Sequence, residues 1–110
     1  MSIVFIDKGI EEFDNLYNEL SKTHLVYLLD DKKNPLEQIS ELISHNSNLS
    51  SIHIFSHGSP GVLKFLSGSI SSDNLLNYNQ EIKSISNSLG PNGNIHLYGC
   101  NVGQGDKGLE

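Results

Sequence analysis

Short apolar runs alternate along this chain with segments whose apolar residues recur at helical spacing, and this alternation restricts the fold more than any other feature. Four runs are typical of buried strands: Ile3 to Asp7, His24 to Leu29, Ser51 to Ser56 and Asn94 to Gly99. Three segments between them have the periodicity of amphipathic helices: Ile10 to Leu20, Leu36 to Ile43 and Leu75 to Leu89. The order predicts an α/β fold, a three-layer α/β/α sandwich with a mostly parallel sheet.

Local signals mark two helix boundaries and one hairpin. Asn34-Pro35-Leu36-Glu37 favours a helix start, because it offers an N-cap, a proline at the first helical position and an early acidic residue. Gly90-Pro91 ends the last helical stripe. The segment Val62 to Ile70, interrupted by a glycine, is predicted to form a small hairpin.

The composition is that of one globular domain. Leu, Ile, Val and Phe supply 34 of the 110 residues, which is enough for a hydrophobic core. We predict a single domain over residues 1–108 and interpret Leu109-Glu110 as the remnant of a purification tag. The single Cys cannot form an internal disulfide. No apolar run approaches the roughly 18 residues of a membrane span, so no membrane span is predicted.

Charge argues against nucleic acid as a partner. Thirteen acidic residues against seven basic ones give a net charge of −6, and all the basic residues are Lys. Binding to phosphates needs clustered cations, which this sequence lacks. The N-terminus has no basic segment followed by a long apolar one, so no Sec-type signal peptide is predicted.

Two residues flanked by glycine, His57 and Cys100, follow strand runs. Ligands of open α/β sheets bind outside the carboxyl ends of the strands, and both residues are predicted at that edge. An imidazole beside a thiol raises the fraction of nucleophilic thiolate. The backbone amides of Gly58 and Cys100 could then bind an oxyanion. The pattern predicts a His–Cys dyad for acyl transfer, although either residue alone would more often be a packing residue.

Two carboxylates lie at the same predicted edge. Asp7 and Asp30 each end a strand run, so either could orient a substrate or a catalytic group. Acidic residues at such positions more often cap a helix or a turn. Both alternatives are kept open for Asp7 and Asp30.

A second pair of histidines lies within the predicted strands. His53 and His96 are each four residues ahead of the dyad residues, about 13 Å along a strand, so all four side chains cannot bind one metal ion. A side-by-side pair of buried, neutral, hydrogen-bonded rings is favoured over a metal site. No metal or other cofactor is predicted.

The segments His53 to Gly61 and Leu97 to Val102 resemble the two signature blocks of a bacterial family, the domain of unknown function 4347. The resemblance also covers Ile6-Asp7 and Asp73 to Leu75, so it extends over nearly the whole chain. Such domains occur near the N-termini of very large secreted or surface proteins with cadherin-like or calcium-binding repeats. The resemblance implies a secreted or cell-surface location, and a cytoplasmic one if the protein is not exported.

This family in turn resembles the caspase-like cysteine peptidases. In those enzymes a His-Gly turn precedes a Cys at a strand end by about fifty residues, and the spacing here is 43. The resemblance implies caspase-like topology, with Cys100 as nucleophile, His57 as base and Gly58 in the oxyanion hole. It implies a peptide segment as substrate, including one of the parent polypeptide. The alternative is a non-catalytic interaction or export module.

The caspase-like sheet continues beyond the Cys strand, whereas this sequence ends ten residues after Cys100. The resemblance therefore implies a partial domain, with activity reduced or absent. Without further strands, Asn94 to Gly99 would be an edge with unpaired backbone groups and apolar side chains. Such edges pair readily with another chain, so we expect a homodimer through this strand.

Overall fold

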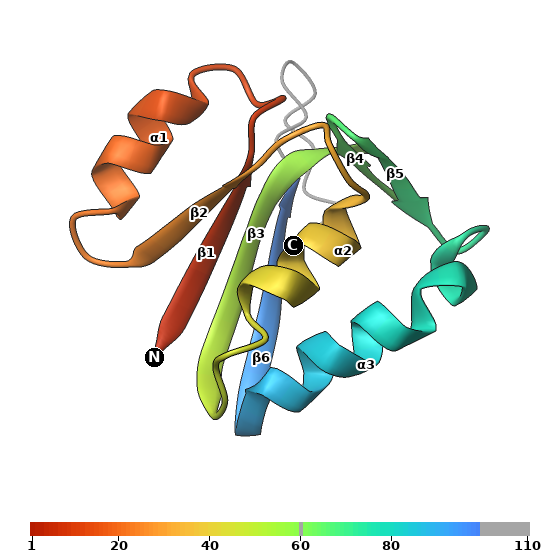
Figure 1. Ribbon diagram of the computed structural model, residues 1–110. Coiled ribbons are helices and arrows are strands. Elements are labelled where there is room, and N and C mark those ends of the chain that lie inside the picture. The colour runs from red at the N-terminus through yellow and green to blue at the C-terminus, as the bar shows by residue number, and fades with distance from the viewer. Residues whose placement is uncertain (60, 100–110) are drawn as a thin grey trace.

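The computed structural model describes residues 1–59 and 61–99, and its architecture is an α/β fold with a six-stranded mixed sheet (Figure 1). Four parallel neighbours follow the order β2-β1-β3-β6, namely Leu25–Leu29, Ser2–Asp7, Leu49–Ser59 and Leu89–Gly99. Strands β4 (Val62–Phe65) and β5 (Gly68–Ser71) form the predicted hairpin, which pairs antiparallel with the end of β3. The sequence thus predicted the α/β class and the hairpin correctly.

The expectation of a mostly parallel sheet is wrong, and the length of β3 gives the reason. The pairing of β3 with β1 ends at Phe55, and its last pair with β6 among the described residues is Ser56 with Gly99. Buried backbone groups beyond that point need other partners. The hairpin supplies them, because residues 57–59 pair with residues 62–64. Instead of a turn after Ser56, the chain therefore continues as a strand through Ser59.

In the described chain, three α-helices and one 3-10 helix connect the strands. They are α1 Phe13–Leu20, α2 Pro35–Leu42, η1 Leu75–Tyr78 and α3 Asn79–Ser88. The predicted N-cap is confirmed, because Asn34 Oδ1 accepts a hydrogen bond from the Leu36 amide at 2.8 Å. The α-helical part of the last helical segment begins later than predicted, since its first turn is 3-10. None of the described helices has the length and apolarity that a membrane crossing requires.

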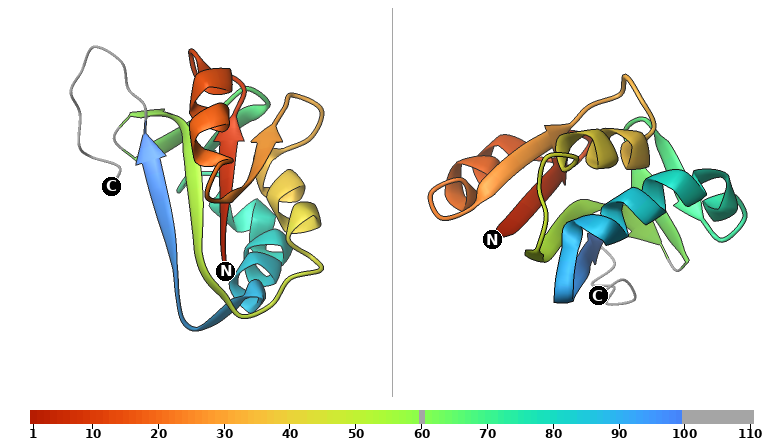
Figure 2. Two further views of the ribbon diagram at one scale, coloured as in Figure 1. Left: turned by 90° about the vertical axis from the view of Figure 1, so that its left-hand side faces the viewer. Right: turned by 60° about the horizontal axis from the view of Figure 1, so that its bottom comes forward.

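Helices pack on both faces of the sheet (Figure 2). Successive side chains of a strand point to opposite faces, so β1 directs Val4 and Ile6 toward α1 and directs Ile3 and Phe5 toward α2 and α3. Other strands and the two helices complete the larger core with buried side chains that include Leu29, Leu49, Ile52, Ile54, Ile39, Ile43 and Ile85. This two-sided burial accounts for the nearly continuous apolar runs of the central strands.

Helix α1 covers only part of its face. It packs against β1 and β2, and the left view of Figure 2 shows β3 and β6 without a described helix on that side. The side chains of His53, Phe55 and Tyr98 there are half-buried, and His96 is exposed. The sheet thus presents a row of rings beside α1.

Shortening a core side chain of β3 should destabilise the whole domain. Ile52 is fully buried, so Ile52→Ala leaves a cavity and should lower the free energy of unfolding by about 2–5 kcal/mol. Denaturant titration measures the change. Leu76→Ala is the control, because this side chain is 77% exposed and its loss should cost no more than about 0.5 kcal/mol. Equal losses in the two variants would contradict the assignment of the core.

Candidate functional site

His57 lies near the carboxyl end of β3, where parallel pairing gives way to the hairpin. Its Nε2 atom is 2.9 Å from the carbonyl oxygen of Gly9. Because a carbonyl can only accept a hydrogen bond, Nε2 must carry the hydrogen. In the neutral ring the lone pair then lies on Nδ1. This contact therefore selects one tautomer of His57 and makes Nδ1 the basic nitrogen.

The turn that follows β1 presents the Gly9 carbonyl. The backbone carbonyl of Asp7 accepts a hydrogen bond from the Ile10 amide at 3.1 Å, and Asp7 Oδ2 accepts one from the Gly9 amide at 3.0 Å. A Cβ atom at position 9 would lie 2.7 Å from Asp7 Oδ2. Only glycine therefore fits this turn without a displacement of the carboxylate.

Asp7 also reaches the hairpin. Its Oδ2 atom accepts a second hydrogen bond, at 2.9 Å, from the amide of Leu66 in the turn between β4 and β5. The side chain is completely buried, and among the described residues its Oδ1 atom has no hydrogen-bond partner. Burial raises the pKa of Asp7, while the amides of Leu66 and Gly9 and the positive charge of His57 act in the opposite direction.

The second predicted carboxylate, Asp30, does not join this arrangement. Its Oδ1 atom accepts a hydrogen bond from the Lys32 amide at 3.0 Å, which closes a turn after β2. Because β1 lies between β2 and β3, a strand separates the end of β2 from that of β3. The Asp30 backbone amide donates to Gln38 Oε1 at 3.0 Å, and Gln38 Nε2 donates to the Asp30 backbone carbonyl at 2.9 Å. Asp30 therefore has a turn-capping position.

Cys100, the predicted nucleophile and second oxyanion donor, lies outside the described residues. Gly58 is buried in β3 and pairs with Leu63 of β4. At the neighbouring strand end, Ser56 of β3 pairs with Gly99 of β6. The described chain thus brings His57, Gly58 and the last residue before Cys100 to one edge of the sheet.

The predicted side-by-side arrangement of the two histidines is confirmed, but the expected burial is wrong, because His53 is half-buried and His96 is exposed. His53 and His96 occupy the same register position, with ring centroids 4.8 Å apart and planes inclined by 10°. His53 Nε2 lies 3.0 Å from Ser51 Oγ, and its Nδ1 lies 2.9 Å from the Tyr98 hydroxyl. Two register pairs further along, Phe55 stacks on Tyr98 with ring centroids 4.3 Å apart. Stacked rings and hydroxyl contacts therefore join β3 to β6 just before the dyad position.

Burial lowers the pKa of His53, and the nearby rings of His96 and His24 lower it further. The neutral form is thus favoured, and it can donate from one nitrogen and accept at the other. Within residues 1–59 and 61–99, no group of three or more His, Cys, Asp or Glu side chains could hold a metal ion. The stacked rings and the contact of His53 with the Tyr98 hydroxyl are part of the packing between the two strands.

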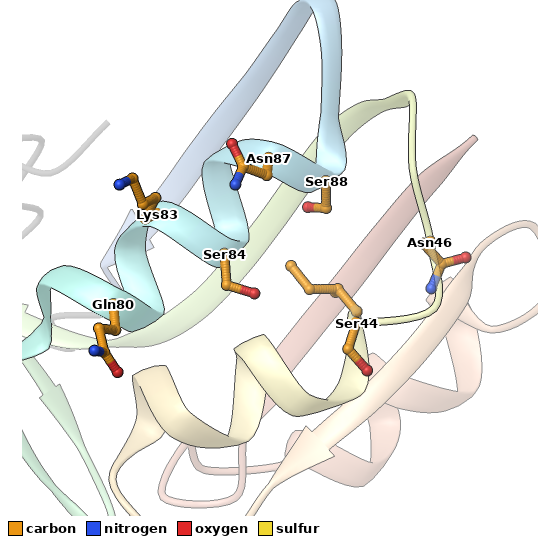
Figure 3. A pocket seen from close by; sticks show the side chains of 8 residues that line it. Ser44, Asn46, Gln80, Lys83, Ser84, Asn87 and Ser88 are labelled. Atoms are coloured by element: carbon orange, nitrogen blue, oxygen red, sulfur yellow. The ribbon is translucent and has the colours of Figure 1, made fainter.

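A polar hollow lies away from His57, at the opposite end of the parallel strands (Figure 3). Its volume is about 460 Å³, and α2, α3 and the loop before β3 surround it. Seven polar side chains and Ile43 line it: Ser44, Asn46, Gln80, Lys83, Ser84, Asn87 and Ser88. Because ligands of open α/β sheets bind at the carboxyl ends of strands, this hollow is not the predicted site.

An apolar cavity of about 250 Å³ lies closer to His57, between the hairpin, α3 and β6. Leu63, which pairs with Gly58, forms part of its wall, as do Ile54 and Leu97. Its lining offers no acid or base.

Sequence reasoning missed two members of the site, the Gly9 carbonyl and the Leu66 amide. Both are backbone groups, so residue type gave no direct signal. The spacing of Asp7 and Gly9 directly after a strand is typical of a turn in which Asp binds the amide two residues on. That spacing could have indicated the turn, but not its contact with His57.

Fold and site together define an α/β domain that holds a histidine at the carboxyl edge of its sheet. A backbone carbonyl selects the tautomer of this histidine. The chain belongs to the family named domain of unknown function DUF4347, which it matches over residues 3–110. The family assignment from the segments around His57 and Cys100 is thereby confirmed. No curated protein matches the sequence.

The lowered pKa of His53 predicts a loss of stability in mild acid. Below pH 6.5, the ordinary value, the unfolded chain takes up a proton on this residue before the native chain does. The free energy of unfolding should therefore fall as the pH drops below 6.5, and the contribution of His53 should be fully present above it.

Denaturant titrations between pH 5 and 7.5 measure this dependence, which should be weaker in His53→Gln. His45→Gln is the matched control, because it removes an exposed histidine outside the ring cluster. An identical pH dependence in wild type and His53→Gln would contradict the prediction.

Proposed function

We propose that this domain is a cysteine peptidase-like module with caspase-like, three-layer topology, in which His57 and Cys100 form a catalytic dyad. The observation that supports it best is the hydrogen bond from His57 Nε2 to the Gly9 carbonyl, which leaves Nδ1 as the basic nitrogen. A general base in that tautomer at the carboxyl edge of an α/β sheet is suited to activating a nucleophile.

Covalent geometry supports Cys100 as that nucleophile. Gly99, its neighbour in the chain, pairs with Ser56, the residue before His57. Consecutive Cα atoms are about 3.8 Å apart, and neighbouring strands are about 4.8 Å apart. Gly99, the residue before the proposed nucleophile, thus lies beside the residue before His57, and this register supports the proposed dyad.

In the proposed reaction, His57 takes the thiol proton and the Cys100 sulfur forms a bond to a peptide carbonyl carbon. The amides of Gly58 and Cys100 stabilise the negative oxygen of the tetrahedral intermediate. The peptide C–N bond then breaks, and His57 donates its proton to the leaving amine. Water hydrolyses the resulting thioester and restores the thiol.

The substrate we propose is a peptide segment, including one in the parent polypeptide of a large exported or surface protein. The absence of Arg and the net charge of −6 disfavour a nucleic-acid substrate. The competing function is a non-catalytic interaction or export module. A reactive thiol would distinguish the enzyme from this alternative.

The proposed dyad predicts a thiol that ionises more readily than a free one. The rate of iodoacetamide modification of Cys100 between pH 5 and 10 should give an apparent pKa below the ordinary value of about 8.5. His57→Ala should move that pKa back toward 8.5, because it removes the base. His45→Ala, a change of an exposed histidine outside the site, serves as the control. An unshifted thiol pKa, equal in both variants, would favour the non-catalytic module.

The edge of β6 supports a second proposal, a homodimer. Strand β6 pairs with β3 on one side, and no described strand pairs with its other side. Ile95 on this strand is 43% exposed. Two copies joined antiparallel along β6 would satisfy the free backbone groups and bury this side chain.

Light scattering at several concentrations measures the mass in solution. We expect a concentration-dependent dimer that Ile95→Lys weakens by placing a charge at the proposed contact. Leu76→Lys, at an exposed position on η1, should leave the dimer intact. A strict monomer at every concentration would refute the dimer.

A further inference from the structure

The direction of the Gly9 carbonyl is fixed by hydrogen bonds on the opposite side of its own peptide group. A trans peptide is planar, so its N–H and C=O point in opposite directions. The N–H of that peptide belongs to Ile10 and is bound at 3.1 Å by the Asp7 carbonyl. Anchoring this N–H therefore aims the Gly9 oxygen away from Asp7, and this oxygen accepts from His57 Nε2.

The preceding peptide is anchored as well. Its N–H, on Gly9, binds Asp7 Oδ2 at 3.0 Å. Asp7 thus holds both peptides that flank the Cα of Gly9, one through its backbone and one through its side chain. A carboxylate that moved would release the Gly9 amide and with it the turn that orients the carbonyl.

Capping this turn does not by itself explain the burial of Asp7. Asp30 binds the amide two residues on at the same distance, 3.0 Å, yet its side chain stays partly exposed. Asp7 is completely buried and leaves one carboxylate oxygen without a partner among the described residues. Burying a carboxylate in this way is costly. The difference between the two turns is the Leu66 amide, which binds only Asp7.

We propose that Asp7 is a positioning residue for His57, which acts through the Gly9 carbonyl and is itself held in place by the Leu66 amide of the β4–β5 turn. A contribution of Asp7 to catalysis rests on the proposed function, but its effect on the His57 tautomer does not. The hairpin and the histidine are thereby coupled. Movement of the Leu66 amide away from Asp7 weakens the hydrogen bond that selects the tautomer.

The tautomer of His57 can be measured directly from the ¹⁵N chemical shifts of its ring, in the Cys100→Ser background and at mildly alkaline pH. We expect the Nε2–H form to dominate in this parent protein. Asp7→Asn should lower the ratio of Nε2–H to Nδ1–H by about tenfold, the effect of losing about one net hydrogen bond. Asp30→Asn, the matched change on β2, should leave the ratio unaltered.

Leu66→Pro tests the link to the hairpin. Proline lacks the N–H, and at this position that N–H binds Asp7 rather than a strand. The variant should lower the same tautomer ratio, whereas Leu66→Ala keeps the amide and should not. If Asp7→Asn fails to fold, comparison of Leu66→Pro with Leu66→Ala still tests the proposal.

An unchanged tautomer ratio in folded Asp7→Asn or in folded Leu66→Pro would overturn the proposal. So would an equal change in Asp30→Asn. Alkylation of Cys100 is measured separately, in chains that retain the thiol, and there Asp7→Asn should slow the reaction by no more than about tenfold, the limit set by the fall in the tautomer ratio. An ordinary thiol in wild type together with a shifted tautomer in Asp7→Asn would refute the peptidase function and leave the positioning role in place.

Discussion

Strand β3 is hydrogen-bonded to three other strands, and the sheet depends on this shared pairing. Without β3, the described strands would separate into the β1–β2 pair, the β4–β5 hairpin and a lone β6. Two-stranded pairs are at best marginally stable in water. The buried side chains of Ile52 and Ile54 join β3 to the larger core as well. His57 lies on β3 and is therefore held in place by the strand that pairs with the most neighbours among the described strands.

The site lies where β3 exchanges its parallel partners for the hairpin, and this location has an electrostatic consequence. Near that exchange, the end of β1 and the β4–β5 turn each leave a backbone amide that points at one buried oxygen of Asp7. Such amides stabilise a carboxylate, while the surrounding apolar residues disfavour its charge. Burial outweighs the two amides, so the pKa of Asp7 is raised, and this carboxyl group lies near His57. Perturbed groups of this kind are concentrated at functional sites.

Sequence patterns predicted the elements and the order in which they alternate. The N-cap at Asn34 and the pairing of His53 with His96 followed from local chemistry and from equal spacing ahead of the strand ends. These features depend on residues close in sequence or on a repeated register. Family membership followed from the two segments around His57 and Cys100.

Features that depend on backbone groups or on distant residues were not predictable. The extension of β3 requires a hairpin partner. The apolar pattern of residues 51–56 predicts neither the full length of β3 nor the mixed sheet. The contact between Asp7 and Leu66 joins residues 59 positions apart through a main-chain amide. The Gly9 carbonyl likewise has no side-chain signature. Peptidase chemistry, location and dimerisation stay predictions.

The strand order also governs how the domain can form during synthesis. β1 emerges first, but its second edge is filled by β3, and Ile3 pairs with Ile52, 49 positions later. At ribosomal speeds, that delay is roughly 3–10 s. During this interval the β1–β2 pair exposes apolar side chains and an open edge, which is the state in which nascent chains aggregate or recruit chaperones. The central positions of β1 and β3 thus make formation of the sheet depend on contacts of long sequence separation, which are the contacts that slow folding.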